Sequence, residues 1–357
     1  MKNPHDEHEK LAISTNHTVT REESKTLPTE SITNESTNIT NLETNISAQI
    51  PSSSIEITEQ QAETVAAEEE EATFIGPTKI KKWVVQHYEK LPTWLRDNEF
   101  IINGHRPPLP SIRDCLKSIF SIHSETGNIW THLLGCIAFF ILAAWFLIEA
   151  KDGTNLQEKI IFSFFFTGAI LCLGLSFTFH TFICHSPTAS KIFSKLDYAG
   201  ITTLIIGSFI PYIYYCFYCR LEPKIIYISM ICIFGLAAII VSMLDKFSEI
   251  AFRPVRAGVF LAMGLSGVLP AFHLMYTDGL DVLINQMSFI PLVIMALLYI
   301  FGALIYGFRI PEKYFPGRFD LWFQSHQLFH ICVVCAAFTH YYGIRQLAHL
   351  RLLEGKC

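Results

Sequence analysis

Long apolar stretches separated by short polar segments make up most of the chain from residue 128 onwards. Each stretch reaches the roughly 20 residues that a helix needs to cross the hydrocarbon core of a bilayer. Seven such stretches lie at 129–149, 160–184, 196–218, 224–244, 255–276, 286–308 and 320–343. Backbone polar groups in lipid must be paired within the protein, so runs of this length predict helices. The pattern therefore predicts an all-α membrane protein, a bundle of seven transmembrane helices.

Two further features refine this pattern. Pro211, Pro270 and Pro291 fall inside predicted spans and are expected to kink them. Ahead of the first span, the segment IRDCLKSIF at 112–120 places its apolar residues on one helical face, with its basic residues off that face. We expect a short helix lying on the membrane surface there. A loop with scattered apolar residues is the alternative.

The first 77 residues have a different composition. They contain almost no aromatic residues, are dense in Ser, Thr, Asn and Glu, and include the acidic run EEEE at 68–71. Such a segment buries too little apolar surface to offset its ordering entropy, so we predict a disordered tail at 1–77. The opening MKNPHDEHEK has no apolar core, and no cleavable signal peptide is expected. The remaining predicted parts are a juxtamembrane segment at 78–127, the bundle at 128–348 and a C-terminal tail at 349–357.

The basic residues favour a cytoplasmic N-terminus. With that orientation ten Lys and Arg near span ends face the cytoplasm and seven face outward, and further basic residues lie between Lys79 and Arg106. Four N-x-S/T sequons in the tail argue the other way if they are glycosylated, but a tail of this composition produces sequons by chance. We predict that the N-terminus is cytoplasmic and the C-terminus extracellular. No basic patch with interleaved aromatic residues suggests nucleic-acid binding.

Ten cysteines include two C-x-x-C pairs, Cys216/Cys219 and Cys332/Cys335. The second pair lies in an apolar run without a partner pair, which argues against a zinc knuckle. The first pair is open to two interpretations, a strained disulfide or packing in the interior, and we favour packing.

Counting spans places several polar residues on one face of the bundle. In a seven-span bundle the starts of odd spans and the ends of even spans share a face. His180 ends the second span, Asp197 begins the third, and His326 and His330 begin the seventh. Three histidines and one carboxylate are therefore expected at one depth, near the face assigned to the cytoplasm.

The spacing of these residues favours a metal site. His326 and His330 are four apart, so they project from one helical face about one turn apart. His180 would complete three imidazole ligands and leave a fourth position open, which is typical of catalytic zinc, although the ligands alone admit other metals. We predict a zinc ion bound by these three histidines. Ser176 and Asp197 are then expected to hold a bound water or orient a ligand.

Other histidines are less well placed. His340 lies ten residues beyond His330, about 15 Å along a helix, and cannot share the same metal. His273 is expected at the opposite face and His185 outside the span. His132 begins the first span at the right depth and stays open as an alternative ligand. The competing interpretation of all these residues is hydrogen-bonded packing inside a bundle.

Six segments match a known family. They are SIHSETGNIWTHLLG (121–135), SFTFHTFICHS (176–186), FSKLDYAGI (193–201), GSFIPYIYYCFYC (207–219), RAGVFLAMGLSGVLP (256–270) and FDLWFQSHQLFH (319–330). Over about residues 80–350 the chain resembles the progestin and adipoQ receptor family, most of all its adiponectin-receptor branch. The resemblance implies a seven-span plasma-membrane protein with a cytoplasmic N-terminus and an extracellular C-terminus. It also implies zinc held by His180, His326 and His330 with Asp197 and Ser176 beside a bound water, and His132 is not a ligand in the family pattern.

The resemblance implies functions from two classes. One is a receptor for an adiponectin-like protein on the extracellular face, with a cytoplasmic signalling adaptor at the N-terminal region, that regulates fatty-acid oxidation and glucose metabolism. The other is an intramembrane zinc hydrolase that cleaves a ceramide-type lipid amide held in the bundle, with Asp197 accepting and returning the proton. Alternatives are a zinc that only clamps spans two and seven, and a regulator of membrane-lipid composition. A homo-oligomer is a further hypothesis.

Overall fold

The computed structural model describes residues 83–148, 156–286 and 288–354. The chain divides into two units, Met1–Thr78 and Lys79–Cys357, and all the described residues belong to the second. The predicted disordered tail at 1–77 lies outside the described residues, as do the last three residues of the predicted C-terminal tail.

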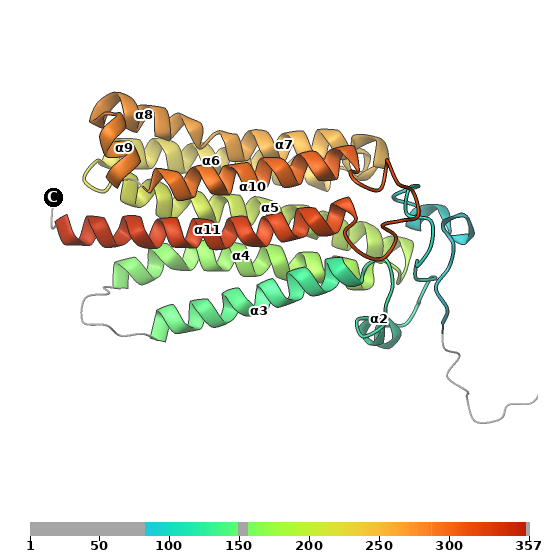
Figure 1. Ribbon diagram of the computed structural model, residues 1–357. Helices are drawn as coiled ribbons and strands as arrows, with labels where there is room; N and C mark the ends of the chain where they lie inside the picture. The colour runs from blue at the N-terminus through green and yellow to red at the C-terminus, as the bar shows by residue number, and fades with distance from the viewer. Residues whose placement is uncertain (1–82, 149–155, 287, 355–357) are drawn as a thin grey trace, which may run out of the picture. The chain divides into compact units, whose positions relative to one another are not determined.

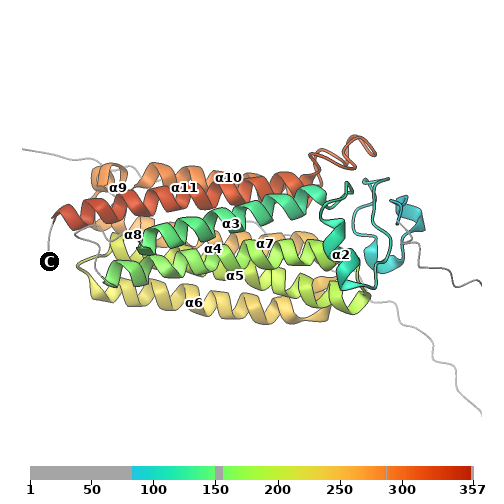
Figure 2. The same cartoon turned by 90° about the horizontal axis from the view of Figure 1, so that it is seen from below.

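Seven helical segments among the described residues are long and apolar enough to cross a membrane. They are α3 (Thr126–Ile148), α4 (Leu156–Phe182), α5 (Pro187–Cys216), α6 (Leu221–Met243), α7 with α8 (Arg253–Leu265 and Val268–Asp278), α10 (Phe289–Phe308) and α11 (Ser325–Glu354). Figures 1 and 2 show them side by side in one bundle, with α3 and α11 both starting at the end where α2 lies. The described residues contain no strand, only an isolated bridge between Gln86 and His105. The prediction of an all-α, multi-pass membrane protein is confirmed.

Shorter helices lie outside the spans. They are α2 (Ile112–Ser118), α9 (Leu280–Gln286) and the 3₁₀ helices Tyr88–Lys90, Thr93–Leu95, Asp245–Ser248 and Ile250–Phe252. The predicted short helix before the first span is therefore confirmed as α2, whose apolar side chains Ile112 and Leu116 are exposed. This outward apolar face is what a helix lying on a membrane surface requires.

The predicted start of the third span was wrong by nine residues, because α5 begins at Pro187 rather than at 196. The Ser186 hydroxyl caps α5 by accepting a hydrogen bond from the Ala189 backbone N–H at 3.2 Å. Pro187 occupies the first helical turn, where its missing N–H costs nothing. The first two turns of α5 are polar, so a count of apolar residues misses them.

Only one of the three prolines lies in the middle of a continuous transmembrane helix. Helix α5 runs through Pro211. Near Pro270 the span is divided instead, since α7 ends at Leu265 and α8 begins at Val268. The kink predicted at Pro291 was wrong, because α10 begins at Phe289 and Pro291 falls in its first turn, where proline is tolerated.

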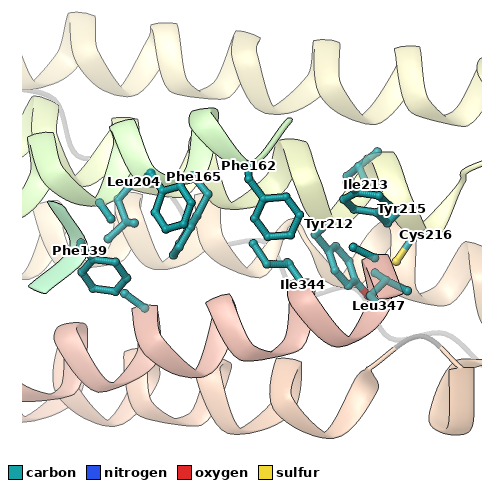
Figure 3. Close-up of a cluster of buried hydrophobic side chains, with 14 of the residues drawn as sticks. Phe139, Phe162, Phe165, Leu204, Tyr212, Ile213, Tyr215, Cys216, Ile344 and Leu347 are labelled. Carbon is teal, nitrogen blue, oxygen red and sulfur yellow. The ribbon is translucent and has the colours of Figure 1, made fainter. Parts of the chain in front are cut away.

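The largest buried cluster joins α3, α4, α5 and α11 (Figure 3). It includes Phe139 from α3, Phe162 and Phe165 from α4, and Ile344 and Leu347 from α11. Helices α4 and α5 approach each other closely. A Cβ atom on Gly207 would lie 2.5 Å from the Phe164 carbonyl oxygen, and one on Gly168 would lie 2.6 Å from that of Thr203. This close packing of small residues sets the distance between the polar ends of α4 and α5.

A cap of loops covers the end of the bundle where α11 begins. The Glu312 carboxylate is fully buried and accepts hydrogen bonds from the Asn98 side chain at 3.0 Å and from the Ser325 backbone N–H at 2.8 Å. Asp320 accepts the backbone N–H of Ile102 at 2.7 Å. Carboxylates satisfy unpaired N–H groups at a helix N-terminus, so Glu312 ties the first residue of α11 to the cap. His326 follows directly.

The cysteines correct one prediction. Cys216 is buried with a free thiol, as packing requires, but Cys219 forms a disulfide. Its partner is not among the other described cysteines, all of which are free, and so it is not Cys216. The preference for packing at this C-x-x-C pair was right for Cys216 and wrong for Cys219, because neighbours in sequence were weighed and distant cysteines were not.

Candidate metal centre

Three imidazoles from two helices converge near the capped end of the bundle. His180 lies in the last turn of α4, and His326 and His330 lie in the first two turns of α11. One potential ligand atom from each histidine lies within 4.8 Å of the others. The ring centroids are 4.8 to 4.9 Å apart and the three ring planes are close to mutually perpendicular. The structure thus brings together all three histidines predicted as zinc ligands.

The surroundings of His180 leave one nitrogen for a metal. Its Nδ1 lies 2.7 Å from the Glu125 Oε2, so Nδ1 carries the hydrogen and donates it. Its Nε2 is buried and has no hydrogen-bond partner in the described structure. A buried acceptor without a partner is costly unless something binds it. The orphaned Nε2 therefore fits a metal ligand.

His330 is arranged in the same way. Its Nδ1 lies 3.2 Å from the Asn128 carbonyl oxygen and 3.4 Å from the Thr131 hydroxyl. A hydrogen on Nδ1 leaves the Nε2 lone pair available. His326 is half-buried, and its ring meets the Tyr306 ring edge-on at 5.0 Å. Neutral imidazoles with one nitrogen held by the protein are the usual ligands of zinc.

Glu125 is a residue of the candidate site that the sequence analysis missed. It stands immediately before α3, holds His180 as described, and accepts a further hydrogen bond from the Asn128 side chain at 2.8 Å. Burial raises the pKa of Glu125, but the hydrogen bonds from His180 and Asn128 and the charge of Arg106 lower it by more, so its pKa lies below the usual range. The carboxylate is therefore ionised and keeps Nδ1 of His180 protonated. Counting polar residues within spans missed it, because Glu125 lies four residues before the predicted start of the first span.

Arg106 fixes the backbone behind His180. It is 3% exposed and donates to the carbonyl oxygens of His180 and Thr181 and to the Ser118 hydroxyl. Carbonyls at a helix C-terminus lack partners within the helix, and a cation there is favourable. Arg106 therefore stabilises the last turn of α4 and joins it to the end of α2. Nothing in the local sequence marks this arginine, because two of its three partners are backbone oxygens 74 and 75 residues along the chain.

The two residues predicted to assist chemistry lie next to the cluster. Asp197 of α5 and Ser176 of α4 are both buried. They line one cavity together with His326 and His330. Ser176 lies beside Asp197, but its hydroxyl oxygen has no hydrogen bond of ordinary geometry. A buried carboxylate and a hydroxyl without a partner at the wall of a cavity are placed to contact a bound molecule.

The remaining histidines lie apart from the three ligand atoms. His340 bonds the Ser208 carbonyl oxygen at 3.0 Å, and His273 lies 3.0 Å from the Tyr227 hydroxyl. His185 contacts Ser186 between α4 and α5. His132, the open alternative, stacks against His330 and does not join the group that could hold a metal. The exclusion of His340 by its distance along the helix is therefore confirmed. His132, which its position along the span could not exclude, lies outside the group that could bind a metal.

Two cavities meet at the cluster. The first, of about 440 Å³, is lined mostly by apolar side chains of α5, α7, α8, α10 and α11 and ends at His326 and His330. Its volume is in the range of ligand-binding pockets. The second, of about 540 Å³, has many polar residues of the cap among apolar ones in its wall and is lined by His180 and His326. The cluster therefore borders both an apolar chamber and a more polar one at the cap.

Comparison with known proteins agrees with this arrangement. Residues 120–341 match the family model described as "Haemolysin-III related". The chain is 60% identical over 285 residues to Progestin and adipoQ receptor-like protein 1 of Caenorhabditis elegans, which covers 80% of this chain and 66% of that protein. This chain belongs to the progestin and adipoQ receptor family.

The chain is also similar to relatives whose names refer to the adiponectin receptor. It is 54% identical over 291 residues to the Adiponectin receptor protein of Drosophila melanogaster, covering 82% of this chain and 66% of that protein. It is 36% identical over 284 residues to ADIPOR-like receptor IZH2 of Saccharomyces cerevisiae, covering 78% of this chain and 90% of that protein. The chain therefore spans slightly less than two thirds of the length of its animal relatives. The resemblance to the adiponectin-receptor branch is confirmed.

Glu125→Gln is expected to weaken metal binding by about 10- to 100-fold, because a neutral amide oxygen accepts the Nδ1 hydrogen of His180 more weakly than a carboxylate does. Competition with a chelator of known affinity, on the purified full-length protein, measures this. Glu222→Gln, an exposed residue in the first turn of α6, is the matched control and should bind zinc as the unmodified chain does. An unchanged affinity in Glu125→Gln would contradict the role assigned to this carboxylate.

Proposed function

We propose that this receptor-family protein is a zinc-dependent hydrolase of membrane lipid amides of the ceramide type. The observation that carries the proposal is the convergence of three imidazoles, two of which, His326 and His330, line an apolar cavity together with Asp197 and Ser176. Lipid amides combine long chains, which suit such a cavity, with one polar bond to be cleaved. The cluster would receive that bond where the apolar and polar chambers meet.

The residues present fit zinc. Three neutral imidazoles match a catalytic zinc site, which uses three protein ligands and leaves one position open. The orphaned Nε2 of His180 is the specific feature that a bound cation would satisfy. When bound, zinc would supply a Lewis acid that polarises an amide carbonyl and makes a nearby water more acidic.

The chain's own residues supply the remaining requirements. Asp197 would accept a proton from the attacking water and return it to the amide nitrogen, which leaves as an amine. Ser176 would donate a hydrogen bond that orients the polar part of the substrate. The apolar wall would exclude bulk water from the hydrocarbon chains of the substrate and of both products, and the more polar chamber at the cap offers a route for water. The products would be a fatty acid and sphingosine.

A role as a receptor is compatible with hydrolysis. The relatives' names support a receptor for an adiponectin-like protein. We further propose that the ligand binds at the extracellular face and that the receptor acts through a cytoplasmic adaptor on fatty-acid and glucose metabolism. We place the N-terminus in the cytoplasm and the protein in the plasma membrane. The disulfide of Cys219 lies at the end of α5 remote from the histidines, and disulfides persist on the oxidising side of a membrane, which supports an extracellular location for that end.

A metal that joins α4 to α11 without chemistry is the competing function, because His180 and the other two histidines come from different helices. Full-length protein in detergent, incubated with a ceramide, separates the two. We expect release of free fatty acid, detected by mass spectrometry, that stops when a chelator removes zinc and returns when zinc is added. Stoichiometric zinc with no fatty-acid release would contradict hydrolysis and favour the structural role.

A further inference from the structure

Helix α3 supplies no ligand to the three-histidine cluster, yet one of its imidazoles lies flat against it. The His132 ring stacks on the His330 ring with centroids 3.5 Å apart and planes 5° from parallel. His132 is 3% exposed, and neither of its ring nitrogens makes a hydrogen bond of ordinary geometry in the described structure. The contact with His330 is therefore made by the face of the ring and not by its nitrogens.

The hydrogen bonds of His330 restrain the plane of its imidazole ring only weakly. Its Nδ1 contacts, at 3.2 Å to the Asn128 carbonyl oxygen and 3.4 Å to the Thr131 hydroxyl, define the tautomer but are long. The torsion that sets the ring plane of a histidine is broad, so a hydrogen bond at one edge leaves the plane poorly defined. A flat ring packed at van der Waals distance restricts that torsion directly.

The other two imidazoles are restrained by different means. His180 has the shorter bond to Glu125, at 2.7 Å, and its backbone is held by Arg106. His326 meets the Tyr306 ring edge-on, with planes 67° apart. Of the three, only His330 has a parallel ring stacked on its face among the described contacts. The direction of its Nε2 lone pair lies in the plane that this stack sets.

We propose that His132 is a positioning residue of the metal centre, which holds the imidazole plane of His330 so that Nε2 points to the site shared with His180 and His326. This inference rests on the metal site of the proposed function but not on hydrolysis. The face of a neutral aromatic ring also attracts positive charge, so the stack suits a His330 that shares the charge of a bound cation. Ring shape, and not the nitrogens of His132, is the feature that matters.

Two substitutions test ring shape against mere filling of space. His132→Phe keeps a flat ring and removes the unpartnered nitrogens, so it should fold at least as well as the unmodified chain. His132→Leu fills a similar volume without a flat face. The assay uses full-length protein in detergent, with zinc affinity from chelator competition, the visible absorption spectrum after loading with Co²⁺, and the metal-free thermal midpoint as a check on folding.

We expect His132→Phe to bind zinc within a few-fold of the unmodified chain and to give the same Co²⁺ bands. His132→Leu should bind zinc about 10- to 100-fold more weakly, as outer partners of metal ligands do, and give shifted Co²⁺ bands at an unchanged metal-free midpoint. Equal affinity and spectra in His132→Leu would overturn the inference. So would a loss in His132→Phe as large as in His132→Leu, or a lack of metal binding by the unmodified chain. The assay does not measure hydrolysis, so its outcome is independent of whether the protein cleaves a lipid amide.

Discussion

Asp197→Asn is expected to remove lipid-amide hydrolysis while the protein keeps its zinc. Asp197 is buried in α5 and lines the apolar cavity with His326 and His330. It does not belong to the three-histidine group that could bind the metal. Asparagine preserves the size of the side chain and cannot accept a proton. General base catalysis contributes about 10²- to 10⁴-fold, so turnover of a ceramide should fall by that factor. Fatty-acid release and metal content are measured on one preparation.

A carboxylate outside the cavity provides the control for this change. Asp245 is exposed and pairs with Lys191 at 2.9 Å and Lys195 at 2.6 Å. Asp245→Asn should retain full turnover and full zinc content. Undiminished turnover in Asp197→Asn would contradict its role as the base, and loss of zinc in that variant would show that the carboxylate serves to hold the metal instead.

The three histidines of the cluster were predictable because span counting tolerates error. The predicted start of α5 was nine residues late, and the last span extends further than expected, yet neither error changes which end of the bundle a residue occupies. His180 and His326 therefore fell on one face whatever the exact helix bounds. The four-residue spacing of His326 and His330 then supplied the shared helical face.

The residues that orient the ligands were harder to predict, for a physical reason. A polar side chain inside an apolar span stands out because its burial is costly, whereas Glu125 and Arg106 lie outside the spans, where charged residues are ordinary. The cap of loops buries Arg106 and half-buries Glu125, because the segment that carries Arg106 packs against the last turn of α4. No periodicity in the sequence encodes that folding, since it depends on contacts between residues 75 and more than 200 positions apart.

The first residue of a transmembrane helix was also difficult to predict from hydropathy. A transmembrane helix begins where its first N–H groups find partners, and this point is set by Ser186 for α5 and by Glu312 for α11, not by the first apolar residue. The position of Pro291 was misjudged because the predicted span began three residues before α10 does. Turn chemistry therefore deserves the same weight as hydropathy when a site lies at the end of a span.

His330→Ala is expected to remove the metal altogether. His330 supplies one of only three ligand atoms in the described group, so the loss should exceed the roughly 10- to 100-fold that follows from removing an outer partner. Metal analysis after purification should find little zinc in the variant. Because a ligand that binds only the folded state stabilises it, added zinc should raise the thermal midpoint of the unmodified chain and leave that of His330→Ala unchanged.

His340→Ala separates metal binding from packing in the same helix. His340 is also a buried imidazole of α11, and its Nε2 bonds the Ser208 carbonyl oxygen at 3.0 Å, away from the cluster. Its loss should lower the thermal midpoint without changing zinc content or the response to added zinc. A His330→Ala protein that kept stoichiometric zinc and the full thermal response would show that the three imidazoles are not the metal centre, and the hydrolytic mechanism would then have no basis.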